Sequence, residues 1–500
     1  MSRNDKNRGG LKAVLIILIL VMIAATAFMI KMCFDLVNEV PERKPDSGSS
    51  VLDDYNPTEP EETEAEETVP PTTIPVPEHV VSTATVGTMG DLLMHTPIFL
   101  PKYNPACYVD GVYNFDPVFE HLKDYTSSLD YAVANLETTL CGTDNGYPYH
   151  GYPNFNCPDA IVDGAKNAGF DMLLTANNHS YDTSLVGYKR TLEVIRGQGL
   201  ATLGTYASAD ETKWTITEVN GIRIGMLCYT YAFSVTDDGR PSLNGMPHIA
   251  EAGLCNYFHS SNLPKFYNEV EGYLSEMKEA GAEATMMFIH WGVEYKTNPN
   301  NEQMTMAQKL CDMGIDVIVG GHPHVIEPID LLESTVDPEH KTVIIYSTGN
   351  AVSNQRTGGS DLFPAGYVED GILFSVTFEK YSDGKVYLAG ADALPTWVNK
   401  FNNESGKLEY NILPLDYDRV DEWQTLFGIS ENTFSAADKS YHRTMDLVGA
   451  GLEECLTWLA EEKVEREQYY YDLAFFPEKF AAEPTEASTE PAGETTAPVA

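Results

Sequence analysis

The stretch ATMMFIHWGVEYKTNPNNEQMTMAQKLCDMGIDVIVGGHPH, residues 284–324, indicates how this chain folds. It contains two short apolar runs, Ala284–Ile289 and Val317–Val319, each typical of a buried strand. Between them, Met304–Met313 has the spacing of apolar residues that a helix requires. The order strand, helix, strand predicts an α/β sheet with helices packed on its faces.

The same alternation extends in both directions along the chain. Further strand-like segments are Ser82–Met89, Tyr131–Ala134, Met172–Thr175, Ile222–Tyr229, Val343–Tyr346 and Ile372–Phe378. Further helical patterns are Ala160–Ala168, Leu185–Gln198 and Lys265–Ala280, and Ala436–Phe475 is mostly helical. The sequence has no internal repeat. We therefore expect a large α/β domain followed by a helical appendage.

Side chains that can bind metals lie at or just beyond the ends of at least five predicted strands. They are Asp91 and His95; Asn135 and Glu137; Asn177, Asn178, His179 and Asp182; His290 and Glu294; and His322 and His324. Open α/β sheets place ligand sites beyond the carboxyl ends of their strands. Taken singly, most of these residues have an ordinary alternative as a turn or a helix cap. His290 is harder to explain that way, because burying it unpaired at a strand end is costly.

Two pairs indicate how these side chains converge. Asp91 and His95 are four residues apart, so one helical turn after the strand would put both on the same side. His322 and His324 flank Pro323, and in an extended chain both imidazoles would face the same way. The glycines before them would let the backbone turn sharply.

The predicted ligands are imidazoles, carboxylates and amides, with no thiolate. Such oxygen and nitrogen ligands suit Mn²⁺, Zn²⁺ or Fe and do not choose among them. Two metal ions would need a bridging carboxylate, and they could activate water and neutralise a phosphate or carbonyl oxygen. A nearby histidine outside the ligand set could protonate a leaving group.

Six motifs in order carry a family resemblance: GDxxxH, NLE, ANNHxxD, HWGxEY, GGHPHVxxP and YSTGN. They resemble the CapA-type bacterial capsule synthesis proteins, over roughly Thr83 to Trp397. That family is associated with poly-γ-glutamate capsules and is related to the calcineurin-like metallophosphatases. The resemblance implies a four-layer α-β-β-α sandwich and two divalent metal ions.

Carried over motif by motif, the resemblance implies a role for each residue. Asp91, His95 and His324 would bind one metal, Glu137 would bridge both, and Asn178, His290 and His322 would complete the second. His179 resembles the proton donor of metallophosphatases, and Asp182 and Glu294 are further catalytic candidates. Asn135 and Asn177 resemble residues that support the ligands.

Three departures separate the chain from the phosphatase pattern. Three residues instead of one lie between Asp91 and His95, and Glu137 stands where phosphatases use Asp; the CapA-type group shares both features. Thr348 and Ala351 stand where the family commonly has Leu and Phe. The first two departures count against a simple phosphomonoesterase activity.

The N-terminal region predicts export from the cytoplasm. Residues 13–31 are almost continuously apolar, which is about the length of a membrane-spanning helix. Basic residues before this run place residues 1–12 in the cytoplasm and the main domain outside, with a single pass through the cell membrane. A signal peptide cleaved near Ala25-Thr26-Ala27 is the alternative, and it also exports the rest of the chain.

The amino-acid composition predicts where the remaining segments of the chain begin and end. Residues 34–80 form an acidic stalk rich in Pro, Glu and Thr, and residues 482–500 form a similar tail; both are expected to be disordered. Between them we expect the α/β domain at 81–400 and a mostly helical extension at 401–480. Eight cysteines without C-x-x-C pairs leave open a Cys141–Cys157 bridge or buried free thiols.

The formal net charge of -42 narrows the possible partners. Such a chain repels nucleic acid and attracts metal cations. Three functions stay open: a metal-dependent hydrolase or transferase in the synthesis, export or anchoring of an anionic capsule polymer, a non-catalytic assembly component beside membrane-bound synthase or export proteins, or a secreted phosphoesterase or nucleotidase. The substrate would be an anionic polymer or a phosphoester.

Overall fold

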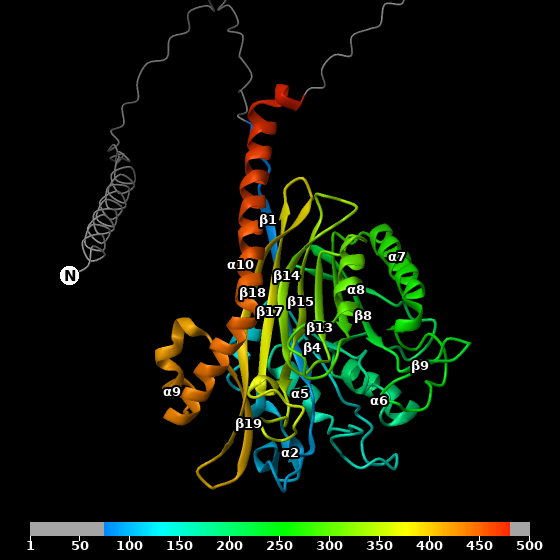
Figure 1. Cartoon of the computed structure of the whole chain (residues 1–500), viewed down its shortest axis with the longest axis vertical. Helices are drawn as coiled ribbons and strands as arrows, with labels where there is room; N and C mark the ends of the chain where they lie inside the picture. Colours follow the sequence, from blue (N-terminus) through cyan, green and yellow to red (C-terminus); the bar gives the residue numbers. More distant parts are fainter. Residues whose placement is uncertain (1–74, 481–500) are drawn as a thin grey trace, which may run out of the picture. The chain divides into compact units, whose positions relative to one another are not determined.

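The computed structural model describes residues 75–480 of the chain (Figure 1). The expected cytoplasmic segment at 1–12, membrane anchor at 13–31 and tail at 482–500 lie outside the described residues, as does most of the expected stalk at 34–80. Within residues 75–480, no helix is both long enough and apolar enough to cross a membrane.

The first of two large sheets has eight strands in the order β19-β18-β17-β1-β4-β5-β6, with β16 also paired to β1. Their bounds are Val80–Leu92 (β1), Tyr131–Asn135 (β4), Met172–Leu174 (β5), Ala201–Leu203 (β6), Asn350–Val352 (β16), Asp370–Tyr381 (β17), Val386–Asn402 (β18) and Leu408–Pro414 (β19). β1, β4, β5 and β6 run parallel, whereas β17, β18 and β19 pair antiparallel. The parallel strands therefore end at one common edge.

The second large sheet has seven strands in the order β11-β8-β12-β13-β15-β14, with β7 also paired to β8. Their bounds are Thr215–Val219 (β7), Ile222–Tyr231 (β8), Tyr257–Phe258 (β11), Ala284–His290 (β12), Val317–Gly321 (β13), Ile326–Glu333 (β14) and Lys341–Thr348 (β15). β11, β8, β12, β13 and β15 run parallel, so their carboxyl ends also share an edge. Two short ribbons complete the strands: Tyr108–Val109 (β2) with Val112–Tyr113 (β3), and Ser234–Val235 (β9) with Pro241–Ser242 (β10).

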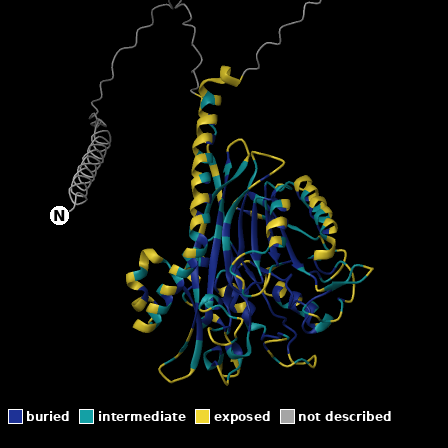
Figure 2. Cartoon of the chain, in the orientation of Figure 1, coloured by how far each residue is buried: buried dark blue, intermediate teal, exposed yellow. Residues whose placement is uncertain are grey.

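Helices cover the outer faces of the two sheets. Their bounds are Thr96–Phe99 (α2), Asp116–Phe119 (α3), Lys123–Thr126 (α4), Ala160–Asn167 (α5), Ser184–Gly197 (α6), Leu263–Glu279 (α7), Asn301–Cys311 (α8), Trp423–Leu426 (α9) and Glu431–Phe475 (α10). Ile161 of α5 packs on the first sheet, and Phe266 of α7 and Leu310 of α8 pack on the second. A central core that includes Met286 and Phe374 lies between the sheets, where Figure 2 shows the densest burial. The chain is thus an α/β sandwich, as expected.

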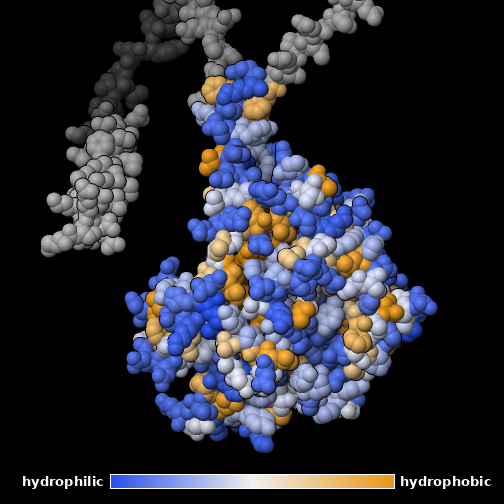
Figure 3. All heavy atoms as spheres, in the orientation of Figure 1, coloured by the Kyte–Doolittle hydropathy of each residue, from blue (hydrophilic) through white to orange (hydrophobic). Residues whose placement is uncertain are grey.

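The C-terminal helix α10 is part of this sandwich and not an appendage. It is 45 residues long and begins at Ser430, whose side chain accepts a hydrogen bond from the backbone N–H of Thr433. α10 contacts β14 of one sheet and β18 of the other, and its residues Val448 and Leu452 join the central core. The far part of α10 is largely exposed (Figure 2), and Figure 3 shows mostly hydrophilic residues over the face of the molecule on view. α10 therefore packs along one side of the two-sheet core, with buried residues from Ala437 to Tyr470.

The expected boundary at residue 400 falls inside a strand. β18 continues to Asn402, and β19, which falls in the expected extension at 401–480, pairs with β18 along its whole length. The sheet therefore includes residues up to Pro414. The seven cysteines among the described residues are all buried and free, so no bridge joins Cys141 to Cys157.

Candidate metal centre

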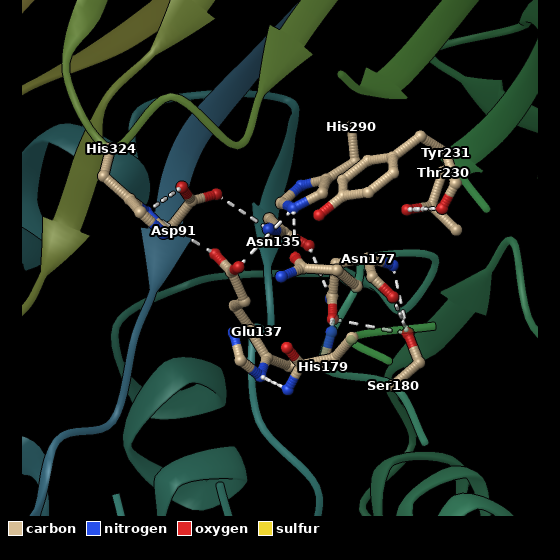
Figure 4. Close-up of polar contacts among 12 residues, drawn as sticks. Asp91, Asn135, Glu137, Asn177, His179, Ser180, Thr230, Tyr231, His290 and His324 are labelled. Carbon is tan, nitrogen blue, oxygen red and sulfur yellow. Dashed lines mark hydrogen bonds and ion pairs between the residues drawn. The ribbon is translucent and has the colours of Figure 1, made fainter. Parts of the chain in front are cut away.

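Neighbouring strands bring the predicted side chains to one edge. In the first sheet, Asp91 of β1 is paired with Asn135, the last residue of β4. In the second, His290 is the last residue of β12 and is paired with Gly321, the last residue of β13. Because the two sheets face each other, their carboxyl ends supply side chains to the same space (Figure 4).

Two groups of buried side chains at this edge can each hold a metal ion. Asp91, Glu137 and His324 form one group, and Glu137, His290 and His322 form the other. Within each group the potential ligand atoms lie within 4.8 Å of one another. Glu137 belongs to both groups, so the two positions are adjacent.

The carboxylate of Glu137 lies between the two groups (Figure 4). Its Oε1 lies 3.4 Å from Nε2 of His290, and its Oε2 lies 3.8 Å from Nδ1 of His324. Both oxygens are fully buried and accept no hydrogen bond from the described residues. A buried carboxylate without donors is costly unless a cation neutralises it. These residues therefore fit divalent metal, and Glu137 would be a ligand shared by the two groups.

Burial controls the protonation of this centre. Burial, followed by the charge of Asp91, raises the pKa of Glu137 well above its ordinary value. Burial alone would raise the pKa of Asp91, but the hydrogen bond and charge of His324 lower it overall. Burial lowers the pKa of His290 to about 3 and also lowers that of His322. Neutral imidazoles are the form that binds metals.

Asn178 joins the group that contains His290. Its Oδ1 lies 2.8 Å from Nε2 of His290, so the same space receives an amide oxygen and an imidazole nitrogen. Asn135 and Asn177 lie behind the ligand atoms. Asn135 donates from Nδ2 to Oδ1 of Asp91 at 2.7 Å, and Asn177 donates to Oδ1 of Asn135 at 3.0 Å. This chain of amides fixes the orientation of the Asp91 carboxylate.

His179 forms a buried pair with Asp182. Nδ1 of His179 lies 2.7 Å from Oδ2 of Asp182, which also accepts the backbone N–H of Phe155 at 2.7 Å. Nδ2 of Asn244 donates to the other oxygen of Asp182 at 3.0 Å. His179 stands outside both ligand groups, so its imidazole is available to transfer a proton. Glu294 is exposed at the edge of the centre, where its charge contributes to the raised pKa of Glu137.

His95 differs from the expectation. β1 continues to Leu92 and α2 begins only at Thr96, so no helical turn joins Asp91 to His95. Instead His95 has an extended backbone, and its Nδ1 lies 3.1 Å from the carbonyl of Leu93 and 3.3 Å from the backbone N–H of Asn354. It belongs to neither ligand group. The four-residue spacing is typical of a helical turn, but β1 extends to Leu92, beyond the apolar run Ser82–Met89, and leaves no room for that turn.

The backbone at His322 and His324 is not extended. Both residues have positive φ, 99° and 57°, a conformation that costs side-chain-bearing residues roughly 1–3 kcal/mol. Position 320 requires glycine because the backbone of Tyr346 passes close to it, and a Cβ there would overlap the carbonyl oxygen of Tyr346. The glycine is not needed to turn the chain. Both imidazoles still reach the centre, with ring centroids 6.0 Å apart. The expected convergence is correct, and the expected backbone was wrong.

Three residues near the centre had not been expected. The ring of Tyr231 lies 4.8 Å from that of His322, and the ring of Tyr295 lies 6.1 Å from that of His324. Tyr231 is the last residue of β8, so the same strand-end rule could have found it. Asn244 reaches Asp182 from a distant loop, and no local sequence signal marks it.

The profile of the family described as bacterial capsule synthesis protein PGA_cap matches residues 85–355, more than half of the chain. The chain belongs to this family. It is 29% identical over 244 residues to the PGA biosynthesis protein CapA of Bacillus subtilis (strain 168), and 28% identical over 250 residues to the capsule biosynthesis protein CapA of Bacillus anthracis. These matches cover 48% and 49% of this chain and 57% and 55% of the relatives.

Two solved structures are similar to the PGA_cap chain at low identity. The putative 5'-nucleotidase of Staphylococcus aureus in complex with alpha-ketoglutarate has a TM-score of 0.36 and 14% identity, covering 72% of this chain and 58% of its own. The sulfate thiohydrolase SoxB of Thermus thermophilus has a TM-score of 0.34 and 12% identity, covering 69% and 59%.

Proposed function

We propose that this PGA_cap protein is a metal-dependent hydrolase or transferase that acts on an anionic capsule polymer of the poly-γ-glutamate type. The observation that carries the proposal is the position of Glu137, whose two unpartnered carboxylate oxygens face different histidine groups. Two divalent ions of the Mn, Zn or Fe type would be held by Asp91 and His324 on one side and by Asn178, His290 and His322 on the other.

When bound, a pair of divalent ions supplies Lewis acidity that activates water and offsets negative charge on the substrate. The side chains of this chain supply the rest. Asp182 lies 2.7 Å from Nδ1 of His179 and leaves Nε2 facing away from this contact. In its imidazolium form, with Nδ1–H donating to Asp182, His179 would give the Nε2 proton to a leaving group and become neutral. The amide chain from Asn177 through Asn135 keeps Asp91 in place.

We also propose that the protein acts at the outer face of the cell membrane. Residues 13–31 would anchor the protein in the cell membrane, with the α/β sandwich outside and residues 34–80 as a tether. There it would work beside membrane-bound proteins that make or export the polymer. Membership of a capsule synthesis family and the apolar N-terminal run support this placement.

The test uses full-length protein loaded with Mn²⁺ and poly-γ-glutamate of narrow size range. We expect the wild type to change the polymer chain length, measured by size-exclusion chromatography, and Glu137→Ala and His179→Ala to abolish that change. Full activity in a metal-free Glu137→Ala protein would refute the proposal. If the wild type leaves the polymer intact while Glu137→Ala still blocks capsule formation in cells, the protein is an assembly component.

A further inference from the structure

The loop after β16 borders the candidate metal centre. The backbone N–H of Asn354 donates to Nδ1 of His95 at 3.3 Å. The next residue, Gln355, donates from Nε2 to the hydroxyl of Tyr295 at 3.2 Å, and the Tyr295 ring packs against His324. The residue that follows, Arg356, is therefore held close to the ligand groups.

Arg356 is a partly buried cation without an anionic partner. Its Nη1 donates to its neighbour's carbonyl, that of Gln355, at 3.3 Å, and its Nη2 is buried with no hydrogen-bond partner. Among residues 75–480, the arginines that form ion pairs do not include Arg356; they are Arg190, Arg196, Arg240, Arg419 and Arg443. Such a buried, unsatisfied charged group is costly to the protein alone.

A second cation lies beside Arg356. Nζ of Lys400 donates to Oδ1 of Asn354 at 2.8 Å, and the same oxygen accepts the hydroxyl of Tyr410 at 2.6 Å. The Tyr410 ring lies under both cations, 6.0 Å from the Arg356 guanidinium carbon and 5.6 Å from Lys400 Nζ. Both cations therefore lie against the same ring.

One carboxylate, that of Glu369, acts on both cations without forming an ion pair with either among residues 75–480. Burial, followed by the charge of Arg356, lowers the pKa of Lys400. The charge of Glu369 raises the pKa of both cations, but its Oε1 accepts the backbone N–H of Thr357 at 3.0 Å. In a chain of net charge -42, two adjacent cations beside a metal centre call for an external anion.

We propose that Arg356 and Lys400 form a binding site for a carboxylate of the substrate chain, next to the candidate metal centre. The inference rests on the proposed function, because it names the part of that substrate which this chain recognises. The flat fork of a guanidinium pairs with a carboxylate through two parallel hydrogen bonds, and Nη2 of Arg356 is free to form one of them. Lys400 is exposed and adds a charge that a passing polymer can reach.

The experiment measures binding by calorimetry with the full chain loaded with Mn²⁺. The probes are a γ-linked glutamate oligomer, the uncharged γ-linked glutamine oligomer of equal length, and inorganic phosphate. The variants are Arg356→Gln, Arg356→Lys and Lys400→Gln. The matched control is Arg196→Gln, which changes an exposed arginine of α6 paired with Glu211.

We expect the wild type to prefer the glutamate oligomer, and Arg356→Gln to weaken its binding about tenfold or more. Lys400→Gln should weaken it less, Arg356→Lys should recover part of it, and the control should bind like the wild type. Unchanged affinity in Arg356→Gln, or equal binding of both oligomers by the wild type, would overturn the inference. Phosphate binding that is tighter and equally sensitive to Arg356 would also overturn it, in favour of a phosphate site.

Metal content and thermal unfolding, measured on the same samples, separate this inference from the proposed function. Arg356→Gln should keep the wild-type metal content, because Arg356 belongs to neither ligand group. If Arg356→Gln fails to fold, Arg356→Lys decides: affinity equal to that of the wild type would contradict the role of the guanidinium fork. If the wild type holds no metal, the proposed function is refuted. The binding preference of that same protein for the glutamate oligomer would still test whether Arg356 binds a carboxylate.

Discussion

Nδ1 of His179 lies 2.7 Å from Oδ2 of Asp182, three residues later in the chain, and both side chains are buried. The contact orients the imidazole through Nδ1, so that Nε2 remains for the reaction. We expect His179→Asn to lower kcat about 10²–10⁴-fold, the usual contribution of a proton donor. Steady-state kinetics and elemental analysis check this, since the metal content should stay unchanged. Lost metal would instead make His179 a ligand.

Gly320 is expected to tolerate no side chain. A Cβ there would overlap the carbonyl oxygen of Tyr346 and lie 2.6 Å from Nε1 of Trp291. We expect Gly320→Ala to lower the free energy of unfolding by about 1–3 kcal/mol, as overpacking does. The matched control is Gly272→Ala in α7, where a Cβ has open space and alanine should stabilise the helix by about 0.5–1 kcal/mol. Denaturant unfolding measures the stability of both variants. A Gly320→Ala protein as stable as the wild type would contradict the close contact between residue 320 and Tyr346.

Arg443 is expected to hold α10 against the first sheet. Its Nε and Nη2 each donate to the carboxylate of Asp370 at 2.6 Å, and Ser440 donates to the same group. Removing one partner of a buried pair typically costs about 3–5 kcal/mol, because the other charge stays buried. Arg443→Ala should therefore lower stability by roughly this amount in denaturant unfolding. Arg419→Ala, which removes an exposed pair with Glu422, should change little.

Glu327 should make stability depend on pH. Burial raises its pKa from 4.5 to about 8, although Gln303 donates to it at 2.6 Å. Between pH values of about 4.5 and about 8, the folded state keeps a proton that the unfolded state releases. The contribution of Glu327 to the free energy of unfolding therefore falls as pH rises through this range and is constant above it. Glu327→Gln should gain stability relative to the wild type across that window. Unfolding measured at several pH values checks it, and a constant difference would contradict the shifted pKa.

Much of the fold was predictable because many of its strands contain an apolar run. Ala284–Ile289 and Val317–Val319 are too apolar for any other place than a core, and the structure has β12 and β13 there. β18 was not predicted, because its 17 residues include Gly390, Asp392 and Pro395, which interrupt the pattern of a strand. Its neighbour β17 supplies the pairing that outweighs those interruptions.

The candidate site was predictable to the extent that strand ends define it. Glu137 and His324 each follow a strand and His290 is the last residue of one, and parallel strands bring such positions together. The positive φ of His324 and the contacts of Arg356 were not predictable, because they depend on chain segments far away in sequence. Spacing alone misled at His95, where the strand continues further than its apolar pattern.

The most direct test counts the metal ions in the full-length protein. After incubation with Mn²⁺ and gel filtration, elemental analysis should find two ions per wild-type chain and at most one in Glu137→Gln. Glu327→Gln, a matched change of a buried carboxylate outside the ligand groups, should keep both. A wild type without metal, or a Glu137→Gln protein that holds as much metal as the wild type, would contradict the bridging role of Glu137.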